Sequence, residues 1–125
     1  MNFGNVAVQS TTGGTVVLVP AGTRTATGGA TLPNTAGTVT AASFTVNGQA
    51  TYTYAITLPS ADVSLSDGAS HTMIVNAFTS NPSATGVLTG GTQVLTVGAT
   101  LNVGAAQAPG VYVSATPFNV TVNYN

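Results

Sequence analysis

The clearest hydrophobic pattern lies at the end of the chain. Residues 110–125 end in a strict period-two alternation, with Phe118, Val120, Val122 and Tyr124 on one face and Asn119, Thr121 and Asn123 on the other. Successive side chains of a β-strand point to opposite faces, so this pattern predicts a half-buried strand. Such a strand needs a partner on each side for its backbone N–H and C=O groups. We expect the second partner to be an earlier strand, solvent, or a strand from another molecule.

The same alternation recurs over shorter segments upstream. Residues 43–58 predict a hairpin, because Asn47-Gly48 suits a type I′ turn and both flanks alternate. Its core face would carry Tyr52, Tyr54, Ile56 and Leu58. Residues 95–103 keep one apolar parity through Gly98, which predicts a bulge or a bend at that glycine. Further strands are predicted over 2–8, 15–19, 23–27, 63–65 and 71–79, and Ala108-Pro109-Gly110 is a type II turn signal that precedes the terminal strand.

These elements indicate an all-β protein. Short strands with turn signals about every eight to twelve residues are typical of an antiparallel, immunoglobulin-like β-sandwich, with a small barrel as the alternative. Glycine, proline, threonine and valine all disfavour helix. A chain of 125 residues fits one domain spanning 1–125 and has no room for a second.

The charge of the chain is unusually low. Charged residues make up 2% of the sequence, namely Arg24, Asp62 and Asp67, against roughly a quarter in ordinary soluble domains. A net charge of −1 gives no basic footprint for nucleic acid or for a membrane surface. No stretch reaches the roughly 18 apolar residues of a membrane span. The uncharged composition, rich in Thr, Asn and Gly, favours an exported, extracellular protein.

The residue types needed for chemistry are scarce. There is no cysteine, which excludes disulfides and thiolate metal sites. His71 is the single histidine, and a Ser-His-Asp arrangement would need it beside Asp62 or Asp67, without any Gly-x-Ser-x-Gly motif. Two aspartates fall short of the six to eight oxygens of a Ca²⁺ site, and Asp67-Gly68 is typical of a turn. We therefore expect no enzyme activity, no cofactor and no metal.

Two surface patterns leave other interpretations open. Asn119-Val120-Thr121 matches the N-glycosylation pattern, but it falls inside a predicted strand, and chance explains it better. Threonine ladders on a flat sheet could order water, and surfaces rich in Tyr and Asn could bind sugars through ring stacking. However, threonine is also the ordinary outward residue of an uncharged strand, and its spacing here follows no fixed repeat.

Several segments together carry a resemblance to a known family. They are Asn2-Phe3-Gly4-Asn5-Val6, Gly22-Thr23-Arg24, residues 42–48, residues 97–101 and the closing residues 118–124. The chain resembles an uncharacterised family of exported bacterial β-sandwich domains, which is in turn similar to the spore-coat-U-like pilins of chaperone–usher pathways. In such pilins an aromatic residue stands next to last and a glycine about fourteen residues before it. Tyr124 and Gly110 occupy these positions here.

The resemblance implies a sandwich that lacks its final strand. A periplasmic chaperone, and then a neighbouring subunit, would fill the groove beside the C-terminal strand by β-augmentation, with an outer-membrane usher as a further partner. The subunit interface would comprise Gly110, Phe118, Val120, Val122 and Tyr124. The implied function is a structural subunit of an extracellular bacterial fibre or pilus that serves adhesion or biofilm formation. The alternative is a self-complete, monomeric surface adhesin or carbohydrate-binding module.

One feature departs from the pilin pattern. Pilins of this kind carry an apolar, alternating N-terminal extension that acts as the donor strand, whereas this sequence starts at Met1, directly before Asn2-Phe3-Gly4. We expect either that the sequence is trimmed or that the donor role is played differently.

Overall fold

The computed structural model describes residues 1–125 and confirms the all-β antiparallel sandwich. No helix in it is long and apolar enough to cross a membrane. The elements are β1 (Asn2–Phe3), β2 (Ala7–Val8), β3 (Gly14–Leu18), β4 (Arg24–Gly28), β5 (Ala30–Thr31), β6 (Val39–Thr40), β7 (Ala42–Asn47), β8 (Thr53–Thr57), β9 (Val63–Ser66), β10 (Thr72–Asn81), β11 (Thr85–Val87), the 3₁₀ turn η1 (Thr89–Gly91), β12 (Thr92–Val103), β13 (Val113–Ser114) and β14 (Thr121–Tyr124).

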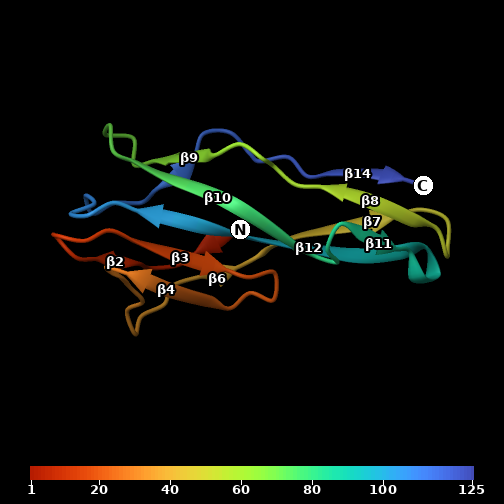
Figure 1. Cartoon of the computed structure of the whole chain (residues 1–125), viewed down its shortest axis with the longest axis horizontal. Helices are drawn as coiled ribbons and strands as arrows, with labels where there is room; N and C mark the ends of the chain where they lie inside the picture. The colour runs from red at the N-terminus through yellow and green to blue at the C-terminus, as the bar shows by residue number, and fades with distance from the viewer.

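The larger sheet is built around β12. Its strand order is β13-β9-β10-β12-β3-β4, and β10 and β12 run side by side along the molecule (Figure 1). β12 pairs with β10 along one edge. Along its other edge, residues 92–97 pair with β7 and residues 99–103 pair with β3. This change of partner falls at Gly98, where a Cβ atom would lie 2.1 Å from the Leu18 carbonyl oxygen. The predicted irregularity is therefore a change of partner at Gly98. The bulge lies opposite, where β10 shifts register between Asn76 and Thr79.

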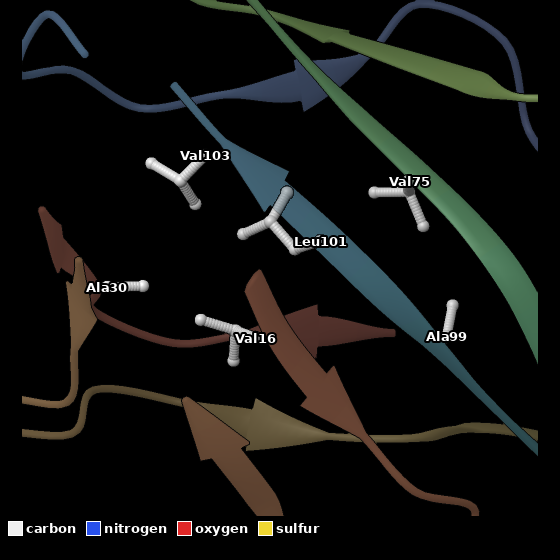
Figure 2. Close-up of a cluster of buried hydrophobic side chains, with 6 residues drawn as sticks. All are labelled: Val16, Ala30, Val75, Ala99, Leu101 and Val103. Carbon is white, nitrogen blue, oxygen red and sulfur yellow. The ribbon is translucent and has the colours of Figure 1, made fainter. Parts of the chain in front are cut away.

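The second layer of the sandwich is divided into two parts. Over one half of the large sheet lies a three-stranded sheet of order β11-β8-β14. The cluster between them holds Ala42, Val46, Leu95 and Val97 from the large sheet with Tyr54 and Leu88 from the other side. Over the other half lie two small pairs, β1-β6 and β2-β5. The cluster below them is drawn in Figure 2 and holds Val16, Ala30, Val75, Ala99, Leu101 and Val103.

The predicted hairpin over residues 43–58 is wrong. β7 pairs with β12 in the large sheet, whereas β8 pairs with β11 and β14 in the small sheet. Gly48 does not adopt the positive φ of a type I′ turn. A Cβ atom there would lie 2.7 Å from Leu88 Cδ1 and 3.0 Å from Tyr124 Cε1, so this glycine makes room for packing. Tyr52 is 48% exposed, although Tyr54, Ile56 and Leu58 do contribute to the core.

The two ends of the chain are less continuous than predicted. The first strand divides into β1 and β2, which pair with different partners. The terminal run divides into β13, which pairs with β9, and β14, which pairs with β8. Gly110 lacks the positive φ that a type II turn requires at its third residue, so the predicted turn is absent. The C-terminal segment therefore passes from the large sheet to the small one.

Candidate functional site

An apolar groove lies between the N-terminal segment and the segment from Pro109 to Phe118. Its volume is about 740 Å³. One wall is the N-terminal segment 1–6 with Thr38, and the other is the segment from Pro109 to Phe118. The floor is apolar and comprises Val63, Leu65, Met73, Val75, Phe78 and Leu101. Val75 and Leu101 are core residues with only 4% exposure, so the groove reaches the core cluster of the larger sheet.

Arg24 of β4 fixes the N-terminal wall. Its Nη1 donates hydrogen bonds to the carbonyl oxygens of Phe3 and Asn5, the latter at 2.9 Å, and its Nη2 donates to the carbonyl oxygen of Ala36 at 3.3 Å. No carboxylate pairs with it. The planar guanidinium can serve several acceptors at once, so the chain's one cationic side chain acts as a clamp on backbone carbonyls.

Tyr112 fixes the C-terminal wall. Its hydroxyl donates to the carbonyl oxygen of Ala108 at 2.8 Å and accepts from Gln107 Nε2 at 2.9 Å. The same Gln107 nitrogen donates to the carbonyl oxygen of Thr72 at the start of β10, at 3.3 Å. β13 adds a ladder contact between Val113 and Ser66 of β9. This wall is thus tied to the β9–β10 end of the large sheet.

The C-terminal wall presents an unfinished strand edge. β13 is the last strand of the large sheet and pairs only with β9, so its other backbone edge is free. Val111 and Val113 line the groove and are 81% and 61% exposed. A free edge beside an apolar groove can accept an extended strand, whose backbone bonds to the edge while alternate side chains fill the groove.

The structure divides the five residues that the sequence singled out. Gly110 and Phe118 line the groove. Val120 and Val122 instead pack against the cluster beneath the small sheet. The Tyr124 hydroxyl donates to the carbonyl oxygen of Asn47 at 2.6 Å, which ties the end of β14 to β7. β14 also has only one ladder partner, β8. Both strands of the C-terminal segment, β13 and β14, therefore have one unpaired backbone edge. The interface role of these residues stays a prediction.

Sequence patterns did not predict most of the residues that line the groove. The N-terminal wall and the floor residues Val63, Leu65 and Met73 come from segments that these patterns predicted only as ordinary strands. One signal was present at the other wall. Val111 and Val113 are odd-numbered, whereas the apolar run from Phe118 is even-numbered. A change of parity indicates that a strand has been interrupted.

The polar candidates lie apart from the groove floor. His71 Nδ1 is 2.6 Å from Asp67 Oδ2, and Asp67 is the only hydrogen-bond partner of the His71 ring. Asp62 Oδ1 accepts a hydrogen bond from Asn76 Nδ2 at 3.1 Å. No group of three or more His, Cys, Asp or Glu residues comes together in a way that could hold a metal ion.

Fold and groove together define an antiparallel β-sandwich with an open strand edge. The chain belongs to the family described as "Domain of unknown function (DUF4402)", whose model matches residues 1–124. No curated protein and no solved structure matches the chain.

Proposed function

We propose that this protein is a structural subunit of an extracellular bacterial fibre, assembled by β-augmentation. A strand from a second copy lies in the groove and pairs with the free edge of the C-terminal segment. The observation that carries the proposal is the position of this edge, since β13 borders an apolar groove that reaches Val75 and Leu101.

Exposed apolar side chains gather along this side of the molecule. Met1, Val111 and Val113 line the groove. Phe44 is 38% exposed and packs on Phe118, and Tyr124 on β14 is 56% exposed. Burying apolar surface stabilises a complex by about 25 cal/mol per Å². An inserted strand that covers these side chains would gain that free energy together with its backbone hydrogen bonds.

The favoured occupant is a second copy of this chain. A charged strand would lose its hydration in an apolar groove, and burying an unpaired charge is costly. This chain has no lysine, no glutamate and only three charged residues, so most of its strands would enter the groove without that cost. Donor and acceptor surfaces differ in such a contact. It is therefore heterologous and extends into an open fibre when its rotation does not close.

The resemblance to spore-coat-U-like pilins supports the same function. By this analogy a periplasmic chaperone and an outer-membrane usher would be the assembly partners, and the fibre would lie on the bacterial surface and serve adhesion or biofilm formation. By this analogy the interface includes Gly110, Phe118, Val120, Val122 and Tyr124.

The test is the native mass of the purified chain, measured by light scattering over a range of concentrations. We expect high-mass, heat-resistant assemblies for the wild type. Val111→Asp puts a charge on a groove-lining side chain that is 81% exposed, and it should leave a folded monomer. Val94→Asp is the matched control, because Val94 is 57% exposed and does not line the groove. A wild type that stays monomeric and unfolds cooperatively would overturn the fibre and favour the self-complete adhesin or sugar-binding module. Equal effects of the two substitutions would exclude the groove as the interface.

A further inference from the structure

The pair Asn47-Gly48, which does not form the predicted hairpin, has a chemical reactivity of its own. In an Asn-Gly pair the backbone nitrogen of the glycine can attack the side-chain carbonyl carbon of the asparagine, because glycine has no side chain to hinder the approach. The chain contains a single Asn-Gly pair, and Asn47 is exposed to solvent. Asn47 is therefore the asparagine of this chain that is most prone to spontaneous deamidation.

The reaction requires only water. The Gly48 nitrogen loses its proton and bonds to Asn47 Cγ, the bond between Cγ and the side-chain nitrogen breaks, and that nitrogen leaves with the proton as ammonia. Water then opens the resulting cyclic imide at one of its two carbonyl carbons. Opening at Cγ gives aspartate. Opening at the main-chain carbonyl carbon gives isoaspartate, in which the backbone runs through Cγ and is one carbon atom longer.

The folded chain holds the reacting atoms in an unreactive arrangement. Asn47 is the last residue of β7 and pairs with Thr92 of β12. A side chain of a strand stands roughly perpendicular to the sheet, which keeps Asn47 Cγ away from the backbone nitrogen that follows it. The Gly48 N–H also donates a hydrogen bond to the carbonyl oxygen of Gly91 at 2.9 Å, so its proton is held. Deamidation in the folded protein therefore requires this end of β7 to open first.

The longer backbone of isoaspartate would not fit in this place. A Cβ atom on Gly48 would lie 2.7 Å from Leu88 Cδ1 and 3.0 Å from Tyr124 Cε1, so the backbone there has no spare room. The Tyr124 hydroxyl donates to the carbonyl oxygen of Asn47 at 2.6 Å. In isoaspartate this carbonyl group becomes a free carboxylate, and the added atom moves Gly48 relative to its partner Gly91. The end of β7 therefore cannot keep its native contacts after the modification.

We propose that Asn47 is a deamidation site that the fold protects, and that its isoaspartate product prevents the fold from forming again. The hydrogen bond from Gly48 to Gly91 and the contact of the Tyr124 hydroxyl with Asn47 provide the protection. The modification then accumulates in chains that stay unfolded or whose β7 end opens. Each such chain is lost irreversibly from the folded population. None of these steps requires the protein to assemble.

The first experiment compares deamidation in the folded and unfolded states. The full chain with Val111→Asp is used, because a monomer separates protection by the fold from protection by assembly. It is incubated at mildly alkaline pH with and without denaturing urea, and mass spectrometry of its peptides follows Asn47 and Asn34, which is also exposed but precedes Thr35. We expect Asn47 to react faster than Asn34 in urea and to be protected without urea. Equal rates at Asn47 in the two states, or equal rates at both asparagines in urea, would overturn the proposal.

A second measurement tests the contact with Tyr124. Tyr124→Phe keeps the ring but removes the hydroxyl, and the loss of one hydrogen bond should make opening of the β7 end about fivefold more frequent. We expect about fivefold faster deamidation of Asn47 without urea and an unchanged rate in urea. Tyr52→Phe is the matched control, because Tyr52 is 48% exposed, and it should leave both rates unchanged. A Tyr124→Phe chain that reacts no faster than its parent would overturn the protection by this contact.

A third measurement tests the product. Chains aged in urea are returned to native buffer, and size-exclusion chromatography separates the folded monomer from the rest. We expect isoaspartate at position 47 to be absent from the folded monomer. Freshly prepared Asn47→Asp carries the charge without the longer backbone and should refold fully. Asn47→Gln should still refold after ageing, because its longer side chain closes the ring far more slowly. Isoaspartate in the folded monomer at the same proportion as in the whole sample would overturn the proposal.

Discussion

The centroid of the Phe118 ring lies 5.1 Å from the centroid of the Phe78 ring, and the two ring planes make an angle of 40°. Phe118 comes from the segment between β13 and β14, and Phe78 comes from the bulge of β10. Phe78 packs against both core clusters, and both rings line the groove. The pair therefore closes the groove at the point where the C-terminal segment passes from one sheet to the other.

Removing the Phe118 ring should destabilise the whole domain. Phe118→Ala leaves a gap beside Phe78 and Phe44, and we expect it to lower the free energy of unfolding by about 2 to 3 kcal/mol. Phe44→Ala is the control, because Phe44 is 38% exposed and its loss should cost about 1 kcal/mol. Urea denaturation of both variants measures the difference. Equal losses would mean that Phe118 has no special role in joining the two sheets.

Gly86 of β11 should tolerate no side chain. A Cβ atom there would lie 2.2 Å from Tyr54 Cζ and 2.4 Å from the Tyr54 hydroxyl oxygen. Because Tyr54 is fully buried, Gly86→Ala should overpack the core and cost about 2 to 3 kcal/mol in urea denaturation. Gly104→Ala, which would meet only the end of the Gln107 side chain at 3.3 Å, should change stability by less than about 0.5 kcal/mol. A harmless Gly86→Ala would show that Tyr54 can move aside.

Tyr54 should make the fold sensitive to alkali. Its hydroxyl donates to Gln93 Oε1 at 2.9 Å, and burial, with a smaller contribution from Tyr124, raises the pKa of Tyr54 above its ordinary value of 10.0. Folding thus favours the protonated phenol. The resulting stabilisation is complete below about pH 10 and is lost as the pH rises through the pKa of the folded state. Tyr54→Phe should lose about 1 kcal/mol at neutral pH but show a smaller decline above pH 10. Urea denaturation at several pH values would refute this if the two alkaline declines were parallel.

Asp67 should make the largest contribution to the loss of stability at acidic pH. The Ala69 N–H bond is the largest cause that lowers the pKa of Asp67 below its ordinary value of 3.8, with desolvation opposing it and His71 adding to it. A lowered pKa in the folded state stabilises the fold above about pH 4, and that stabilisation is lost as the pH falls further. Asp67→Asn should therefore flatten the dependence of the unfolding temperature on pH between 2 and 6. Parallel dependences in the wild type and in Asp67→Asn would contradict this assignment.

Strand periodicity predicted the parts of the fold in which one face is buried continuously. Leu95, Val97, Ala99, Leu101 and Val103 share a face in the sequence and are all buried in β12. The Asn47-Gly48 prediction failed because the signal is local. Gly48 leaves space for the side chains of Leu88 and Tyr124, which are distant from it in the sequence. The two alternating flanks belong to different sheets and bury their apolar faces from opposite sides of the core.

The candidate site was predicted only in part, for a related reason. Alternation marked Phe118, Val120 and Val122 as half-buried, and they are. The groove itself depends on where the N-terminal segment lies, and Arg24 fixes that through backbone carbonyls. Hydrogen bonds to carbonyls leave no trace in the sequence, since every residue has one. A lone arginine therefore gave no indication of its partners.

The central position of β12 has a consequence for the order in which this protein can acquire its structure. β3, β7 and β10 all pair with β12, which begins only at Thr92. A ribosome makes the N-terminus first, so β3 and β7 emerge long before their common partner, whereas β10 ends at Asn81, shortly before β12 begins. Pairing across such sequence separations is slow because a large loop must close first. The chain can therefore complete its fold only when nearly all of it has been synthesised, and until then its strands remain open to the factors that receive new polypeptides.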